Sequence, residues 1–169
     1  MLRWLTDKIA LSAPPGGTLL EQTVREQMAG SDAEGVAIVA AIAGLLGTVA
    51  YADRAYAPVE EARIREQLGC VQGLTAAGID AICAVLRENI VGIATVEAPV
   101  YARELLARAD KDLRLEVLDA LVDLAAADDE ITVAETNVLR LTATALGLSQ
   151  GDYNASQARH RDKLKVLQK

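Results

Sequence analysis

The sequence predicts an all-α protein with a single compact helical domain, and three observations support this fold class. Of the 169 residues, 31 are Ala, the strongest helix former. Aromatic residues make up only 3% and Phe is absent, whereas β-sandwiches favour aromatic and β-branched residues. No stretch alternates with a period of two for long enough to compete as a strand. A hydrophobic share of 51% suffices for the core of one domain and argues against disorder.

Helix-start and helix-stop signals divide the chain into about seven to nine helices. A short amphipathic helix, Met1–Leu11, precedes a Pro/Gly-rich linker, which cannot continue a helix. We therefore expect residues 1–17 to form this helix and its linker, and residues 18–169 to form the helical domain. The remaining helices are expected to begin at capping residues or Pro, and several to end near Gly. Their predicted ranges are Thr18–Gly30, Ser31–Tyr51, Pro58–Cys70, Thr75–Asn89, Pro99–Ala109, Asp112–Ala127, Thr132–Leu146, and Ser149 or Asp152 to Leu167.

One segment, Gly35–Ala52, carries no charge over 18 residues, the lower edge of the length that spans a membrane. Its apolar residues are largely Ala and Gly, which insert weakly into lipid. A related segment, Leu113–Ala127, carries four charged residues, so we expect a central helix and no transmembrane span. The first helix, with Trp4, is expected to dock on the domain; association with a membrane surface is the alternative.

The charge and the reactive side chains exclude several classes of function. A net charge of -7 repels a polyanion, so we expect no nucleic-acid partner. The basic tail, Arg159–Lys169, is interpreted as complementing the dipole of the last helix. Cys70 and Cys83 have no disulfide-framework or metal-ligand spacing and are interpreted as small buried groups. His160 is expected to be a solvated surface residue, and the protein is expected to be cytoplasmic because no signal peptide opens the chain.

A helix–turn–helix unit occurs twice in the chain, at an offset of 75 residues. In each unit a long apolar helix ends at an Asp, and a Glu follows seven residues later. The apolar residue of each turn is expected to anchor the turn in the core. The aligned pairs are Asp53 and Asp128, Tyr56 and Ile131, Glu60 and Glu135, Ile64 and Leu139, and Arg65 and Arg140.

The two acidic residues of each turn differ in their structural purpose. Glu60 and Glu135 fall at the third position of a helix, where a carboxylate can accept from the N-cap backbone and gain from the helix dipole. Asp53 and Asp128 fall at the C-terminal end of the preceding helix, where the dipole disfavours a negative charge. They therefore need a compensating cation. The candidates are Arg54, Arg65, Arg140 and a bound metal ion.

The paired pattern resembles the TerB family of tellurite-resistance proteins, which is related to the N-terminal region of DjlA-type co-chaperones. The resemblance covers roughly Gly35 to Tyr153. It implies an all-helical fold in which the two helical hairpins pack with pseudo-two-fold symmetry. Family members usually carry Gly directly after the Asp, a residue that suits a positive φ. This sequence has Arg54 and Asp129 at those positions.

If the two hairpins pack in this way, four carboxylates converge. A hard, oxygen-rich site of this kind suits Ca²⁺, Mg²⁺ or Mn²⁺, and Zn²⁺ is the remaining candidate cofactor. The spacing is not that of an EF-hand, because the Glu follows the Asp by seven residues and not eleven. The predicted metal ligands are Asp53, Glu60, Asp128 and Glu135.

Two hypotheses of function remain open from the sequence. The first is a non-enzymatic, cytoplasmic stress-response protein of the TerB type that binds a divalent metal through the paired loops. The alternative is a co-chaperone-like helical interaction or scaffold module that binds protein partners without metal. In that case the glutamates only cap helices, and the two aspartates pair with Arg65 and Arg140. No motif supports an enzyme, and no catalytic residue is predicted.

Overall fold

The computed structural model describes residues 17–128 and 130–164, and it confirms the all-α fold. The α-helices found there agree with the predicted range of seven to nine. The predicted helix Met1–Leu11 lies outside the described residues, so the division at residue 17 stays a prediction. In chain order the elements are α1 (Leu19–Gln27), α2 (Ala33–Ala50), α3 (Pro58–Gly69), α4 (Ala76–Gly92), the π-helix η1 (Ile93–Glu97), α5 (Ala98–Arg108), α6 (Lys111–Ala125), α7 (Val133–Ala145), α8 (Gln150–Ala158) and the 3₁₀-helix η2 (Arg161–Lys163).

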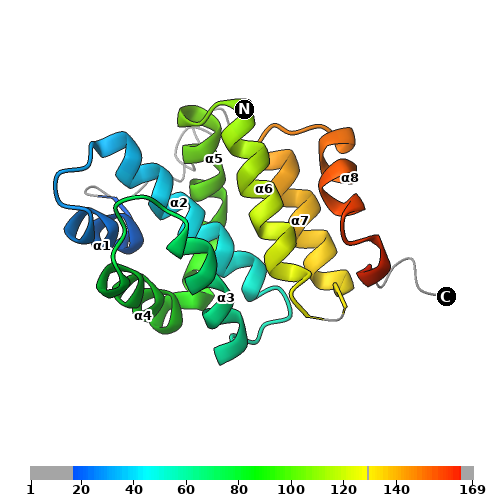
Figure 1. Cartoon of the computed structure of the whole chain (residues 1–169), viewed down its shortest axis with the longest axis horizontal. Coiled ribbons are helices and arrows are strands. Elements are labelled where there is room, and N and C mark those ends of the chain that lie inside the picture. The colour runs from blue at the N-terminus through cyan, green and yellow to red at the C-terminus, as the bar shows by residue number, and fades with distance from the viewer. Residues whose placement is uncertain (1–16, 129, 165–169) are drawn as a thin grey trace, which may run out of the picture.

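Helix α2 forms the centre of the molecule. Figure 1 shows it crossing the middle, with α1 and α4 on one side and α6 and α7 on the other. Within the described part of the chain, α2 is the one helix with the length and hydropathy of a membrane span, yet 72% of its residues are buried in the fold. The uncharged stretch is therefore a buried core helix, as the sequence predicts.

Small residues allow α2 to approach its neighbours closely. A Cβ atom added at Gly44 would collide with the ring of Tyr101 on α5, and one added at Gly47 would lie 2.8 Å from a methyl group of Leu86 on α4. Tyr101 and Leu86 are both fully buried or nearly so. Glycine at these positions thus lets large side chains pack against the α2 backbone, in a core that contains no Phe.

The helix starts follow the predicted capping chemistry in most cases. The Thr18 hydroxyl accepts from the Glu21 backbone at 3.2 Å, as expected for an N-cap. The prediction for α2 is wrong by one residue, because Asp32, and not Ser31, is its N-cap. The Asp32 carboxylate accepts from the Gly35 N–H at 2.7 Å, which is the hydrogen bond of an N-cap.

The C-terminal region differs from the prediction. The last long helix ends at Ala158 and not near Leu167. The chain then folds back through η2, where the Lys163 carbonyl accepts from the Ile131 N–H at 2.7 Å. Residues 163 and 164 therefore lie against the turn between α6 and α7, which a continuous helix could not achieve.

Two predictions for single side chains are also corrected. His160 is not a solvated surface residue: it is partly buried, with Nε2 2.8 Å from a carboxylate oxygen of Asp123 on α6. Cys83 is buried as predicted, but Cys70 is exposed at the end of α3.

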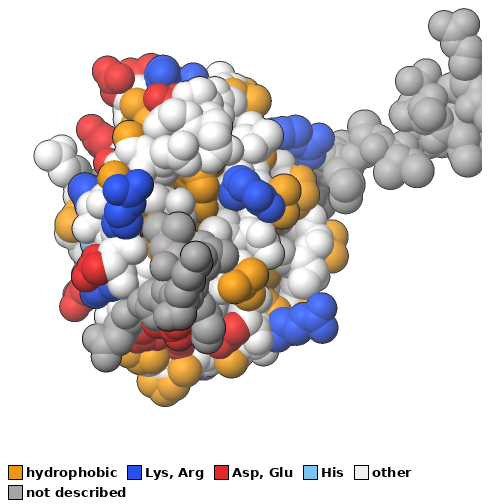
Figure 2. Space-filling model, turned by 90° about the vertical axis from the view of Figure 1, so that its right-hand side faces the viewer, with side chains coloured by type: hydrophobic (Ala, Val, Ile, Leu, Met, Phe, Trp, Pro, Cys, Tyr) orange, Lys and Arg blue, Asp and Glu red, His pale blue; other side chains and the backbone are white. Residues whose placement is uncertain are grey.

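Figure 2, which faces the α8 end, shows acidic and basic side chains interspersed among apolar ones. In the basic tail, Arg159 pairs with Asp119 and Asp123 of α6, whereas Lys163 Nζ donates to the Ala126 carbonyl.

We predict that Gly44→Ala destabilises the protein by about 1–3 kcal/mol, the usual cost of forcing extra volume into a packed core. The matched control is Gly92→Ala, where no atom lies within 4 Å of the added Cβ and stability should rise by roughly 0.5–1 kcal/mol. Urea unfolding monitored by circular dichroism measures both changes. Equal effects of the two substitutions would contradict the close approach of α2 and α5.

Candidate functional site

The first acidic turn connects α2 to α3 and has a left-handed residue at its centre. Asp53 is exposed, and its Oδ1 accepts from the Ala55 N–H at 2.9 Å. Arg54 has a φ of +67°, the only positive φ at a non-Gly position in residues 17–128 and 130–164. The turn therefore keeps the backbone geometry that glycine suits, although a left-handed conformation costs an ordinary side chain about 1–2 kcal/mol.

Both loop glutamates cap the helix that they begin, as predicted. Glu60 Oε2 accepts from the Ala57 N–H at 2.8 Å. Glu135 Oε2 accepts from the backbone N–H and the hydroxyl of Thr132 at 2.7 and 2.8 Å. Thr132 in turn accepts from the Glu135 N–H at 3.1 Å, which completes a capping box. These contacts hold each glutamate in one orientation at the start of α3 and α7.

An ion pair connects the second acidic turn to the helix that follows the first. Asp128, at the end of α6, lies 3.2 Å from Arg63 Nη2 on α3. The other terminal nitrogen of Arg63 is buried and has no hydrogen-bond partner in the described structure. The two halves of the repeat thus meet at this contact, while their pseudo-two-fold symmetry stays a prediction.

Two of the cations that the sequence offered as partners of the aspartates, Arg65 and Arg140, bind other residues, so the predicted pairing with these two arginines is wrong. Arg65 pairs with Glu61 one turn away and with Asp80 on α4. Arg140 donates to Asn137 on its own helix. The sequence pattern missed Arg63 because it occupies no aligned position of the repeat, and only helix packing brings it to Asp128.

Three of the four loop carboxylates interact through their charges. The pKa of Glu135 is raised, first because the side chain is partly buried, and further because Asp128 and Asp53 repel its charged form. The hydrogen bonds from Thr132 act in the opposite direction. Asp128 and Asp53 belong to different turns, so both turns contribute negative charge to the surroundings of Glu135.

The fit of this region to a metal ion follows from its donors. Each loop carboxylate has one oxygen engaged in the contacts above, and within the described residues its second oxygen accepts no hydrogen bond. These free oxygens suit a hard cation. No group of three or more His, Cys, Asp or Glu among the described residues is placed to hold a metal ion in this conformation. Asp129 lies outside the described residues, and the metal site stays a prediction.

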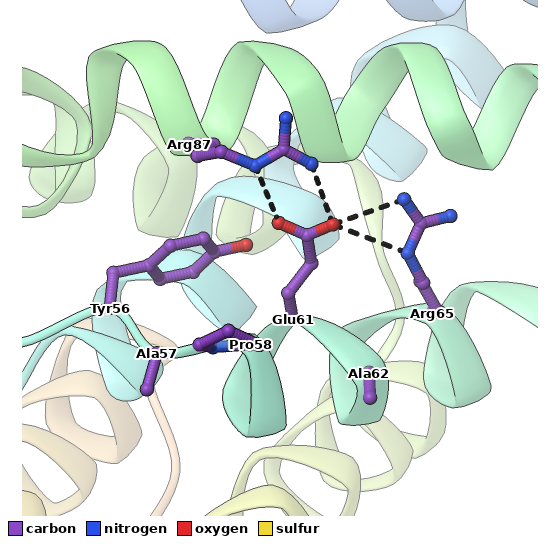
Figure 3. A pocket seen from close by; sticks show the side chains of 7 residues that line it. All are labelled: Tyr56, Ala57, Pro58, Glu61, Ala62, Arg65 and Arg87. Carbon is purple, nitrogen blue, oxygen red and sulfur yellow. Dashed lines mark hydrogen bonds and ion pairs between the residues drawn. The ribbon is translucent and has the colours of Figure 1, made fainter.

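A pocket of about 340 Å³ lies beside the first turn, and sequence reasoning did not find it. Figure 3 shows its polar end, where Glu61 on α3 lies between the guanidinium groups of Arg65 and Arg87. Tyr56, expected only to anchor the turn, also lines this pocket. The sequence offers one hint of a polar role for Tyr56: the aligned residue of the second turn is the apolar Ile131, which the structure buries fully.

The structure is an all-helical domain with two acidic turns, the second of which contacts α3 through the Asp128–Arg63 ion pair. A comparison with protein families identifies this class: residues 39–158 match the family model of the tellurite resistance protein TerB. The chain belongs to the TerB family, and the resemblance found in the sequence is confirmed. Searches of curated proteins and of solved structures found no match.

We predict that Arg54→Gly stabilises the protein by about 1 kcal/mol, because glycine adopts the left-handed conformation without strain. The gain falls below the full strain energy because glycine also increases the entropy of the unfolded chain. The measurement is the free energy of unfolding in urea. Loss of stability would contradict the positive φ at this residue.

A second prediction concerns pH. Because the pKa of Glu135 is raised, the folded state binds its proton more tightly than the unfolded chain does. Ionisation of Glu135 therefore lowers the free energy of unfolding as the pH rises above the ordinary glutamate pKa of 4.5. Glu135→Gln keeps a capping acceptor but removes the charge. The variant should therefore be more stable than the wild type at pH 7, and this advantage should vanish below about pH 4.

Unfolding free energies measured from pH 3.5 to 8, with a chelator present, test this sign. The matched control is Glu60→Gln at the equivalent cap. A Glu135→Gln variant less stable than the wild type at pH 7 would show that capping outweighs burial and repulsion.

Proposed function

We propose that this protein is a non-catalytic, cytoplasmic stress-response protein of the tellurite-resistance type that binds a divalent cation between its two acidic turns. Membership of the TerB family over residues 39–158 supports the general class. The observation that carries the cation proposal is that the two acidic turns adjoin, because Asp128 of the second turn contacts Arg63 on α3, directly after the first turn. In keeping with this, Asp53 and Asp128 both raise the pKa of Glu135. A bound cation relieves this repulsion.

The ligands in this proposal are the free carboxylate oxygens of the repeated pairs. Asp53 and Glu60 would serve from the first turn, and Asp128 and Glu135 from the second. Oxygen donors of this kind favour Ca²⁺, Mg²⁺ or Mn²⁺ over softer metals. Because Asp128 already pairs with Arg63, the cation must compete with that guanidinium, and this competition favours modest affinity.

The arrangement of the remaining reactive groups supports a binding role over a catalytic one. Ser156 donates to Asp119, whereas His160 contacts Asp123. The hydroxyl and the imidazole therefore each have a separate aspartate and do not form the relay in which a histidine activates a serine. We propose accordingly that the protein acts by binding.

An exposed apolar groove favours a second candidate, an interaction module that needs no metal. Its walls come from α2, η1, α5 and α7, its volume is about 290 Å³, and the side chain of Leu141 on its rim is 68% exposed. Arg54 lines the adjoining hollow. The occupant that fits is an amphipathic partner helix with an acidic residue opposite Arg54.

Metal titration separates the two candidates. We predict that millimolar Ca²⁺, Mg²⁺, Mn²⁺ or Zn²⁺ raises the melting temperature, because a ligand that binds only the folded state stabilises it by about 2.7 kcal/mol at a hundred times its Kd. Asp128→Asn should abolish the shift. Differential scanning calorimetry in chelator-treated buffer is the measurement.

The matched control is Asp112→Asn, at the opposite end of α6, which should keep the full shift. No shift in the wild type with any of the four ions would overturn the cation proposal and leave the interaction module. A lower melting temperature of Asp128→Asn without metal would report only its ion pair with Arg63.

A further inference from the structure

The pocket beside the first turn combines apolar walls with one polar end. It lies between the start of α3 and the middle of α4 (Figure 3). Ala57, Pro58, Ala62 and the ring of Tyr56 provide apolar surface. The polar end consists of Glu61 and two arginines. A volume of about 340 Å³ lies within the range of small-molecule sites.

The acceptor atoms at the polar end are fully used. Glu61 Oε2 accepts from Arg87 Nε at 3.0 Å. Its Oε1 accepts from Arg87 Nη2 at 2.7 Å and from Arg65 Nη2 at 3.0 Å. The bond from Arg87 is the largest cause of the lowered pKa of Glu61, so this carboxylate is ionised at neutral pH. Each of its two oxygens already accepts from a guanidinium group.

Two donor groups, in contrast, make no hydrogen bond at all in the described structure. Arg65 spends its three nitrogens on Glu61 and Asp80. Arg87 uses Nε and Nη2, so its Nη1 bonds to nothing in the described part of the chain, and its side chain is 54% exposed. The Tyr56 hydroxyl is buried and has no hydrogen-bond partner among the described residues. Burial raises its pKa above the ordinary range, so it stays a protonated donor.

The unpaired hydroxyl is not a requirement of the fold. Ile131 holds the aligned position of the second turn and is fully buried without any polar atom. An unpaired buried hydroxyl lowers the free energy of unfolding. The first turn therefore bears a loss of stability that the second turn, with Ile131, does not have. Such a group calls for an acceptor that binds to it.

We propose that this pocket binds a small organic oxyanion, a molecule with an apolar body and a carboxylate or phosphate group. The acid group accepts from Arg87 Nη1 and from the Tyr56 hydroxyl, the two donor groups that have no partner in the described structure. The apolar body packs on Ala57, Pro58 and Ala62. Glu61 keeps its bonds to Arg65 and Arg87 and so fixes the positions of both guanidinium groups at the polar end.

The donor inventory selects this class of ligand over the others. A cation would meet the positive charges of the two guanidinium groups that already bind both oxygens of Glu61. A neutral hydrocarbon leaves the Tyr56 hydroxyl unpaired. Guanidinium groups recognise carboxylates and phosphates alike, so both sources are probed. The site shares no proposed ligand with the acidic turns and does not depend on metal.

Calorimetric titration of the full chain tests the proposal with three probes: benzoate, phenyl phosphate and inorganic phosphate. We expect at least one of the two aromatic probes to bind at millimolar concentration or tighter. Inorganic phosphate should bind at least tenfold more weakly than phenyl phosphate, because it lacks the apolar body. Which aromatic probe binds more tightly identifies carboxylate or phosphate as the preferred group.

Variants separate a binding role from a structural one. Tyr56→Phe should raise the melting temperature without ligand, because it removes the unpaired hydroxyl, yet weaken the binding of the probe about tenfold, as expected for one lost hydrogen bond. Arg87→Lys should weaken binding at least as much. The matched control is Arg108→Lys on α5, another arginine paired with a glutamate, which should leave the Kd unchanged.

Three outcomes would overturn the proposal. The first is absence of binding of both aromatic probes to the wild type. The second is equal weakening by Arg87→Lys and Arg108→Lys, which would indicate general charge attraction. The third is unchanged binding to Tyr56→Phe, which would place the probe elsewhere.

Discussion

The close packing of α2 against its neighbours is the constraint on which the rest of the structure depends. Gly44 accepts the ring of Tyr101, and Gly47 accepts side chains of α4. With α2 held in the centre, its C-terminal end determines where the first acidic turn emerges, and α3 and α4 can enclose the pocket beside it. A larger residue in α2 would displace the helices that position both candidate sites.

The two acidic turns combine features that stabilise the fold with features that do not. Glu60 and Glu135 satisfy backbone donors at helix starts, so capping alone explains their presence. The charges of Asp53 and Asp128, in contrast, act against the ionised form of Glu135. Arg54 adds a strained backbone angle in the same region. Local rules broken together at one place are typical of functional sites.

Much of the fold could be predicted from the sequence because helix boundaries are local. Capping residues such as Thr18 and Thr132 act within four residues of chain, and the alternation of buried and exposed positions repeats every turn. Errors arose where distant segments compete with local preference. The last helix stops at Ala158 because the following residues pack against Ile131, and His160 is partly buried because α6 supplies Asp123.

The candidate sites divide in the same way. By itself, the sequence determined the fold class, the repeated acidic turns and the TerB family, since all three are encoded in residue type and spacing. Only the tertiary structure decided that Asp128 pairs with Arg63 and that Glu61 lies between Arg65 and Arg87. Glu61 and Arg65 are one turn apart on α3, but Arg87 lies on α4 and Asp128 in the turn after α6. The contacts made by Arg87 and Asp128 therefore depend on how α3 packs against α4 and α6, a geometry that no spacing along the chain specifies.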